Sequence, residues 1–150
     1  MPRSSTWTDD RGSASLEFVT VGMVLLVPLV YLVLTMSAIQ AGSLAAEGAA
    51  RQAARVFVQS GTEEEANAAA LRALEFALTD HGVEPHGAEL AISCSPRPDA
   101  CLTRQGYVTV TVGLLVDLPL APTVLTGEFP LAIPLSATAT QQVSRFWSEP

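Results

Sequence analysis

The sequence lacks the residues and motifs on which most enzyme active sites depend. It has no lysine and only two histidines and two cysteines, and charged residues make up 15% of its 150 residues. It contains no glycine-rich phosphate loop, C-x-x-C pair, H-E-x-x-H helix or G-x-S-x-G elbow. Because few titratable side chains are present for acid, base or nucleophilic chemistry, we predict that the chain is not an enzyme and uses no cofactor.

Positive charge is also scarce. Eight basic residues stand against fifteen acidic ones, which gives a formal net charge of -7. A chain of this kind lacks the basic surface that neutralises phosphates, which argues against nucleic acid as a partner. His81 and His86 have no carboxylate or cysteine at a metal-ligand spacing, so we interpret them as solvent-exposed loop residues and expect no metal site.

Long apolar runs, in contrast, are present, and one dominates the N-terminal part. Residues 16–39 are almost entirely apolar. As a helix this run would be about 36 Å long, enough to cross a hydrocarbon core of roughly 30 Å. A secretory signal peptide is the alternative, but its apolar region is only about 7 to 15 residues long and ends at a small-x-small cleavage site. We therefore predict a membrane-spanning helix in contact with lipid.

The helical pattern continues beyond this span. An apolar face recurs at helical spacing and is formed by Ala46, Ala50, Ala53 and Phe57. We therefore predict one helix over residues 13–59, whose small side chains in residues 41–54 let another element pack closely. Pro28 lacks a backbone N–H and its ring clashes with the preceding turn, so we expect a kink or a locally loosened turn at this position.

Gly61 interrupts the pattern, and a second helix is expected to begin after Thr62. Thr62 and Glu65 have the spacing of a capping box, so we interpret the acidic residues 63–65 as a helix N-terminus and not as a metal site. The predicted buried stripe of this helix comprises Ala70, Leu71, Leu74, Ala77 and Leu78. A stop signal follows at residues 80–82.

From residue 88 onward apolar and polar residues alternate, which is typical of half-buried strands. The expected strands are residues 89–93, 107–116 and 131–140. Pro134 predicts an edge position for the third strand. The sequence thus predicts an α+β fold with a long N-terminal helix, a second helix and a small three-stranded antiparallel sheet, in which residues 60–150 form one extracytoplasmic domain.

Cys94 and Cys101 are the only cysteines, and the segment between them contains Pro96 and Pro98, which favour a turn. We interpret the pair as a disulfide. Closing so short a loop would stabilise the fold by roughly 2 to 3 kcal/mol in the chain-entropy model, and it implies an oxidising, extracytoplasmic setting. Two free thiols in a reducing compartment are the alternative.

Residues 11–18 read Arg-Gly-Ser-Ala-Ser-Leu-Glu-Phe, and the apolar run follows directly. This junction, the polar leader before it and the small disulfide-bearing sheet after it resemble the type IV pilin superfamily, in particular the TadE-like minor pilins of the Tad (tight adherence) system. The resemblance covers the architecture of the whole chain, with Glu17 and Phe18 where the family commonly has Glu-Tyr.

In that family a membrane-embedded prepilin peptidase cuts after the glycine, which here implies cleavage between Gly12 and Ser13 and a leader of residues 1–12. The resemblance also implies a cytoplasmic leader, an extracytoplasmic sheet and assembly with other pilin subunits, driven by a secretion ATPase and an inner-membrane platform protein. The expected role is that of a minor pilin, or pseudopilin, in a Tad-type pilus for adhesion or secretion. The alternative is a single-pass, membrane-anchored binding domain without a pilus role.

Insertion of a charged side chain such as Asp or Lys at the centre of a bilayer is unfavourable by roughly 2.5 to 3.5 kcal/mol of free energy. Glu17 is also a charged residue within an apolar run, so it requires a partner. Cleavage would create an α-amine on Ser13 that pairs with Glu17 in the same chain or in a neighbouring subunit. We favour the neighbour, so that Glu17 and Phe18 set the axial register of the assembly. Alternatively, Glu17 is hydrated at the interface and belongs only to the peptidase recognition sequence.

Overall fold

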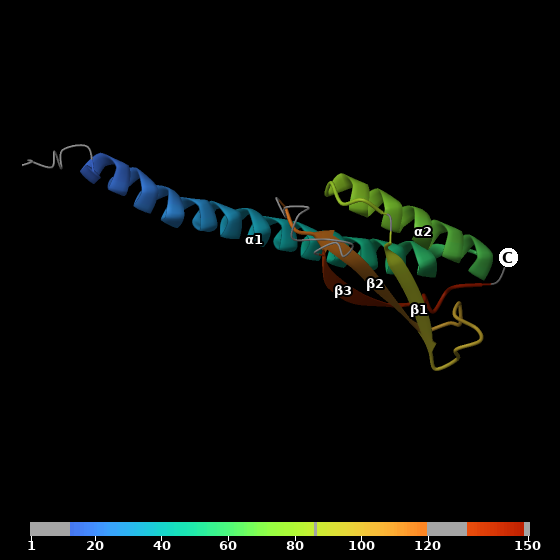
Figure 1. Ribbon diagram of the computed structural model, residues 1–150. Helices are drawn as coiled ribbons and strands as arrows, with labels where there is room; N and C mark the ends of the chain where they lie inside the picture. The colour runs from blue at the N-terminus through green and yellow to red at the C-terminus, as the bar shows by residue number, and fades with distance from the viewer. Residues whose placement is uncertain (1–12, 86, 120–131, 149–150) are drawn as a thin grey trace, which may run out of the picture.

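The computed structural model describes residues 13–85, 87–119 and 132–148. Two helices are followed by a three-stranded antiparallel sheet, so the predicted α+β class and the order of its elements are confirmed (Figure 1). The elements are α1 (Ser13–Gln59), α2 (Glu63–Asp80), β1 (Glu89–Ser95), β2 (Tyr107–Asp117) and β3 (Ala132–Gln142). The predicted leader, residues 1–12, and His86 lie outside the described residues.

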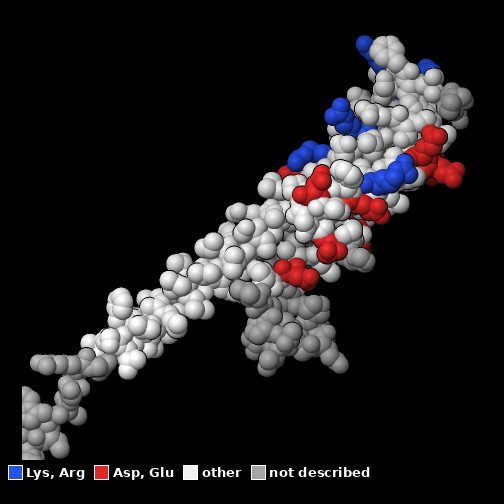
Figure 2. Space-filling model, turned by 90° about the horizontal axis from the view of Figure 1, so that it is seen from above, with Lys and Arg blue, Asp and Glu red and all other residues white. Residues whose placement is uncertain are grey.

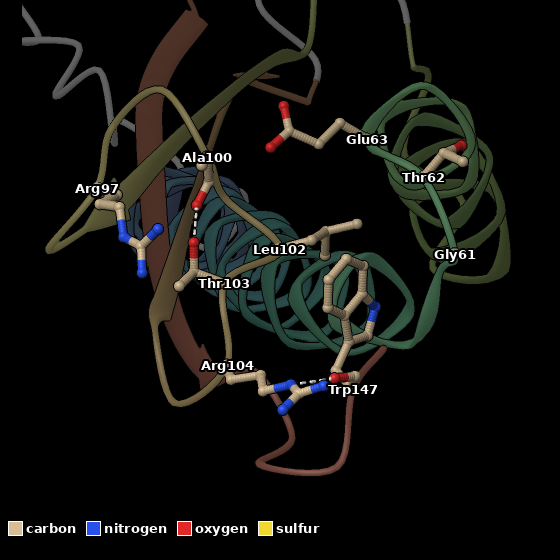
Figure 3. A pocket seen from close by; sticks show the side chains of 9 residues that line it. All are labelled: Gly61, Thr62, Glu63, Arg97, Ala100, Leu102, Thr103, Arg104 and Trp147. Carbon is tan, nitrogen blue, oxygen red and sulfur yellow. Dashed lines mark hydrogen bonds between the residues drawn. The ribbon is translucent and has the colours of Figure 1, made fainter. Parts of the chain in front are cut away.

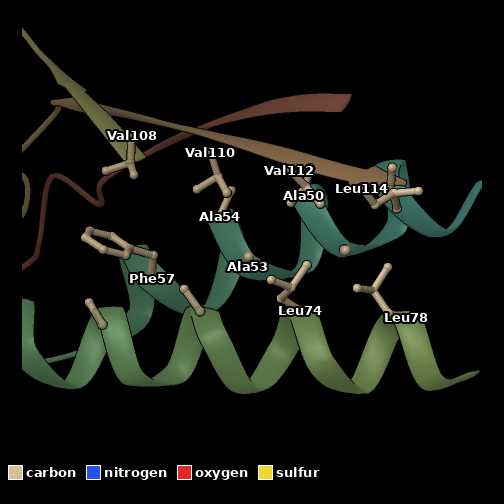
Figure 4. Close-up of a cluster of buried hydrophobic side chains, with 14 of the residues drawn as sticks. Ala50, Ala53, Ala54, Phe57, Leu74, Leu78, Val108, Val110, Val112 and Leu114 are labelled. Carbon is tan, nitrogen blue, oxygen red and sulfur yellow. The ribbon is translucent and has the colours of Figure 1, made fainter. Parts of the chain in front are cut away.

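The C-terminal half of α1 forms the centre of the domain. It lies between α2 on one side and the inner face of the sheet on the other (Figure 4). Ala53 points toward Leu74 of α2, whereas Ala50 and Ala54 point toward the valines of β2 (Figure 4). Six alanines of α1 are at most 1% exposed, because their small side chains let both neighbours approach the helix backbone. The largest fully buried side chains are Phe57, Leu78, Val108, Val110, Val112 and Val143.

Gly42 marks a close approach between α1 and the sheet. A Cβ atom at this position would overlap the side chain of Val116 in β2 and would lie 3.1 Å from Cδ1 of Leu135 in β3. Only glycine lets the helix pass this close to both strands. The small side chains of residues 41–54 predicted that another element packs closely against α1, and at Gly42 that element is the sheet.

Helix α2 begins as its sequence predicts. The hydroxyl of Thr62 accepts a hydrogen bond of 3.2 Å from the backbone N–H of Glu65. The buried residues of α2 are Ala66, Ala70, Leu74 and Leu78. The prediction that Leu71 belongs to the buried stripe is wrong, because its side chain is 51% exposed. Ala73 and the predicted Ala77 are partly buried and pack against the core beside this row, whereas the row on the other side, which contains Leu71, is exposed.

The sheet has β2 in the centre, with β1 and β3 as antiparallel edges. Buried residues alternate with less buried ones along β2. On the outer face the hydroxyl of Thr109 lies 2.9 Å from that of Thr140, and the hydroxyl of Thr111 lies 3.1 Å from that of Thr138. Pro134 lies in β3, and the predicted edge position is confirmed.

Candidate functional site

The N-terminal half of α1 projects from the domain (Figure 1). Every side chain from residue 14 to residue 30 is exposed, and those of Leu16 and Phe18 are 70% and 79% exposed. The face seen in Figure 2 carries no charged side chain along this projecting part. Apolar surface on this scale is rare on soluble monomers and marks a site for lipid or for another protein.

Packing of α1 against the buried core begins near the end of the apolar run, and Tyr31 and Thr35 before it are partly buried. Ala38 packs against the core and Gly42 is buried, while the apolar run ends at Ile39. The projecting part, residues 13–37, spans roughly 37 Å, and the hydrocarbon core of a bilayer is roughly 30 Å thick. The helix is therefore long and apolar enough to cross a membrane while its domain stays outside the hydrocarbon region.

The predicted cleavage junction lies at the start of this helix. Ser13 is the first residue of α1, and Gly12 lies outside the described residues. Glu17 and Phe18 follow about one helical turn after Ser13, and both side chains are exposed. The helix thus begins at the residue that would become the N-terminus after cleavage.

Thr20 and Glu17, two polar residues near this end of α1, differ in whether their side chains form hydrogen bonds. The hydroxyl of Thr20 donates a hydrogen bond of 2.7 Å to the carbonyl oxygen of Leu16, so it is compatible with a lipid environment. Glu17 takes part in no hydrogen bond or ion pair among the described residues. Glu17 is also the only charged residue in residues 13–46. It is therefore the one charge in this helix segment that requires a partner from elsewhere.

Pro28 does not end the helix. Helix α1 continues through Pro28, and its ribbon is unbroken in Figure 1. The proline removes the donor that the carbonyl oxygen of Val24 would otherwise bind. The position of the predicted kink or loosened turn therefore lies near the middle of the projecting part, where the described side chains of residues 14–30 are exposed.

The disulfide between Cys94 and Cys101 is present, as the sequence predicted, with the two Cα atoms 5.1 Å apart. The backbone N–H of Cys101 also donates a hydrogen bond of 2.7 Å to Oε1 of Glu63. This bond joins the disulfide loop to the first residue of α2. Sequence reasoning missed it, because nothing in the local pattern of residues 63–65 distinguishes this carboxylate from an ordinary helix cap.

No cluster of histidine, cysteine, aspartate and glutamate residues suited to a metal ion occurs among the described residues. His81 caps the C-terminus of α2 and is exposed. No model of a known protein family matches the chain, and no curated protein or solved structure matches it. The candidate functional features among the described residues are the projecting part of α1, its first residue Ser13 and the single carboxylate of that part, Glu17.

Proposed function

We propose that this chain is a TadE-like minor pilin, which a prepilin peptidase cuts between Gly12 and Ser13 and which then joins a Tad-type pilus. The observation that carries the proposal is the projecting half of α1. This segment begins at Ser13, exposes apolar side chains all round and ends where packing against the domain begins. A segment of this kind suits both states of a pilin, one surrounded by lipid and the other surrounded by neighbouring helices.

Glu17 supplies a mechanism for ordered assembly. Removal of the leader leaves a positive α-amine on Ser13, four residues before Glu17. In apolar surroundings an unpaired carboxylate and an unpaired ammonium are both strongly unfavourable, so subunits shifted along the axis are disfavoured relative to those that pair the two charges. Glu17 of one subunit and the amine of its neighbour therefore fix the axial register, and Phe18 adds an aromatic contact beside them.

Membrane location follows from the same proposal. The leader lies in the cytoplasm, the apolar part of α1 spans the inner membrane, and the disulfide-bearing domain lies outside the cytoplasm. A secretion ATPase and a platform protein would then drive the subunit from the membrane into the pilus. The gap left by Pro28 in the helix hydrogen bonding makes the middle of the span easier to bend as the subunit leaves the bilayer.

Substitution of Glu17 tests the proposal. In a strain whose piliation depends on this chain, Glu17→Ala and Glu17→Gln should abolish piliation, because both remove the charge that pairs with the amine. Membrane insertion and leader removal should persist, as measured by fractionation and by the mass of the extracted protein. Glu17→Asp keeps the charge and should retain part of the piliation.

The same variants distinguish the alternatives. Loss of leader removal in Glu17→Gln would assign Glu17 to peptidase recognition instead of register. Normal piliation with Glu17→Gln would refute the register role. A membrane-anchored binding domain without a pilus role predicts that the leader stays attached and that all three variants behave as the unmodified chain does.

A further inference from the structure

The outer edge of β3 is a long strand edge without the usual protection. Strand β3 has eleven residues, as many as the central strand β2, and none of them is charged. No described strand pairs with its outer side, and α1 packs on one face of the sheet (Figure 1). Edge strands of natural proteins are usually short, charged or broken by proline, because their unpaired N–H and C=O groups attract another strand. Pro134 gives such protection only near the start of β3.

The opposite edge of the sheet, β1, runs in the same direction as β3. Both strands are antiparallel to β2, so they are parallel to each other. A second copy placed beside the first in the same orientation therefore brings its β1 next to β3, and its α1 points the same way as the first α1. Antiparallel pairing of two β3 strands would instead point the second α1 in the opposite direction. Two copies anchored in one membrane by α1 are compatible with the first arrangement and not with the second.

The two edges carry complementary side chains on the inner face of the sheet. Leu90 and Ile92 of β1 lie in the same rows as two alanines of β3, with buried valines of β2 between them. These alanines are Ala137 and Ala139. All four residues at the edges are only partly buried, although they pack against the core. A second copy that places its leucine and isoleucine beside the alanines removes apolar surface of both copies from water.

A row of hydroxyl groups crosses the outer face of the sheet and ends at both edges. Ser93, Thr109 and Thr140 lie side by side on the three strands. Oγ1 of Thr109 lies 2.9 Å from Oγ1 of Thr140, and Oγ of Ser93 donates to the carbonyl oxygen of Thr109 at 3.5 Å. Continuing this row into a second copy places its Ser93 beside Thr140, a cross-strand pair that stabilises sheets. The same register pairs the whole of β1 with residues 136–142, which begin after Pro134.

Side-chain hydrogen bonds hold the two edges in a fixed relation at one end of the sheet. Nε of Arg104, in the loop between β1 and β2, donates a hydrogen bond of 2.7 Å to the carbonyl oxygen of Trp147, which follows β3 (Figure 3). In the same loop the hydroxyl of Thr103 donates to the carbonyl oxygen of Ala100 at 2.6 Å (Figure 3). Strands that are already held in place lose less conformational freedom when they pair with another copy.

We propose that copies of this chain in one membrane associate edge to edge, with β3 of one copy pairing in parallel with β1 of a second copy. The register is the one that places Ser93 of the second copy beside Thr140. The contact uses two different edges, so each copy keeps one free edge and association continues beyond a dimer. The proposal rests on the sheet and on a shared membrane orientation, and it does not depend on removal of the leader or on Glu17.

Cysteine cross-linking in membranes of cells that make the full chain tests this contact. Ala91 and Thr138 are exposed on the outer face, and the proposed register places Ala91 of the second copy beside Thr138. Within one chain β2 lies between them, so their Cα atoms are roughly 10 Å apart, beyond the limit of about 7 Å for a disulfide. After mild oxidation, Ala91→Cys combined with Thr138→Cys should give a ladder of products at successive multiples of the monomer mass.

Two matched comparisons separate this contact from random collision. Ala91→Cys combined with Asn67→Cys, at an exposed position on α2, should give no ladder. Co-expression of Ala91→Cys chains with Thr138→Cys chains should give a mixed dimer and nothing larger, because each chain carries one added thiol. All three positions are exposed, so each variant should keep the melting temperature of the unmodified chain.

The proposal is overturned if the ladder is absent from Ala91→Cys combined with Thr138→Cys, or if it is equally strong in the control with Asn67→Cys. It is also overturned if Thr138→Cys alone cross-links as efficiently as the mixed pair, since that result would place β3 beside β3.

Discussion

Glu63 connects two parts of the chain that are 38 residues apart. Its carboxylate accepts the N–H of Cys101, so the first residue of α2 holds the disulfide loop in place. Glu64, the next residue, is also exposed and also lies in the first turn of α2, but no hydrogen bond to another described residue involves its side chain. A comparison of substitutions at the two glutamates therefore separates the effect of this one hydrogen bond from the effect of a negative charge at a helix N-terminus.

We expect Glu63→Ala to lower the free energy of unfolding by about 1 kcal/mol more than Glu64→Ala does. Both changes remove a favourable charge at the N-terminus of α2, but only the first removes the acceptor of the Cys101 N–H. Urea unfolding of the detergent-solubilised protein measures the difference, and hydrogen exchange at the Cys101 amide should speed up only in Glu63→Ala. Equal destabilisation by the two variants would contradict a specific role for Glu63.

Local sequence patterns predicted much of this fold because they report local structure. Three predicted features depend on residues only a few positions apart, and the structure has all of them: the helical spacing of alanines in α1, the Thr62 cap and the alternation along the strands. The bond between Glu63 and Cys101 and the approach of Gly42 to Val116 depend on residues far apart in the chain. No local pattern encodes such contacts. The exposure of Leu71 could not be predicted for the same reason, since it depends on the width of the contact between α2 and α1.

At the scale of an element, α1 combines two different surfaces in one unbroken helix. Its C-terminal half carries small residues that pack between α2 and the sheet, and its N-terminal half carries large apolar residues, most of which are exposed. Gly42 lies close to the boundary and sets how near the sheet can come. Gly48, in the same helix, would place a Cβ atom 3.9 Å from Nε2 of His81, an ordinary contact distance.

Gly42→Ala should destabilise the domain by about 1 kcal/mol, because overlap with Val116 costs roughly 1 to 3 kcal/mol and the better helix propensity of alanine offsets part of it. Gly48→Ala, the matched control, should be neutral or stabilising by up to about 1 kcal/mol. Thermal unfolding in detergent measures both.

Adding Val116→Ala to Gly42→Ala should recover part of the loss, since the smaller side chain makes room for the new methyl group. Equal effects of the two glycine substitutions would show that the close approach at Gly42 does not limit packing.

At the scale of the whole molecule, the described residues form an elongated structure with an exposed apolar helix at one end and the folded domain at the other. Helix α1 runs for about 70 Å, with the predicted cleavage junction at its first residue and the domain around its C-terminal half. The loop that carries the disulfide lies at the end of the domain away from the N-terminal half of α1 (Figure 1).

The central claim is that the projecting helix becomes the N-terminus of a mature pilin subunit. N-terminal sequencing and intact mass measurement of the chain extracted from cells that contain a prepilin peptidase test it most directly. We predict a mature chain that begins at Ser13, and a Gly12→Leu variant that keeps residues 1–12. A membrane-extracted chain that still carries its leader in the presence of an active peptidase would contradict the account.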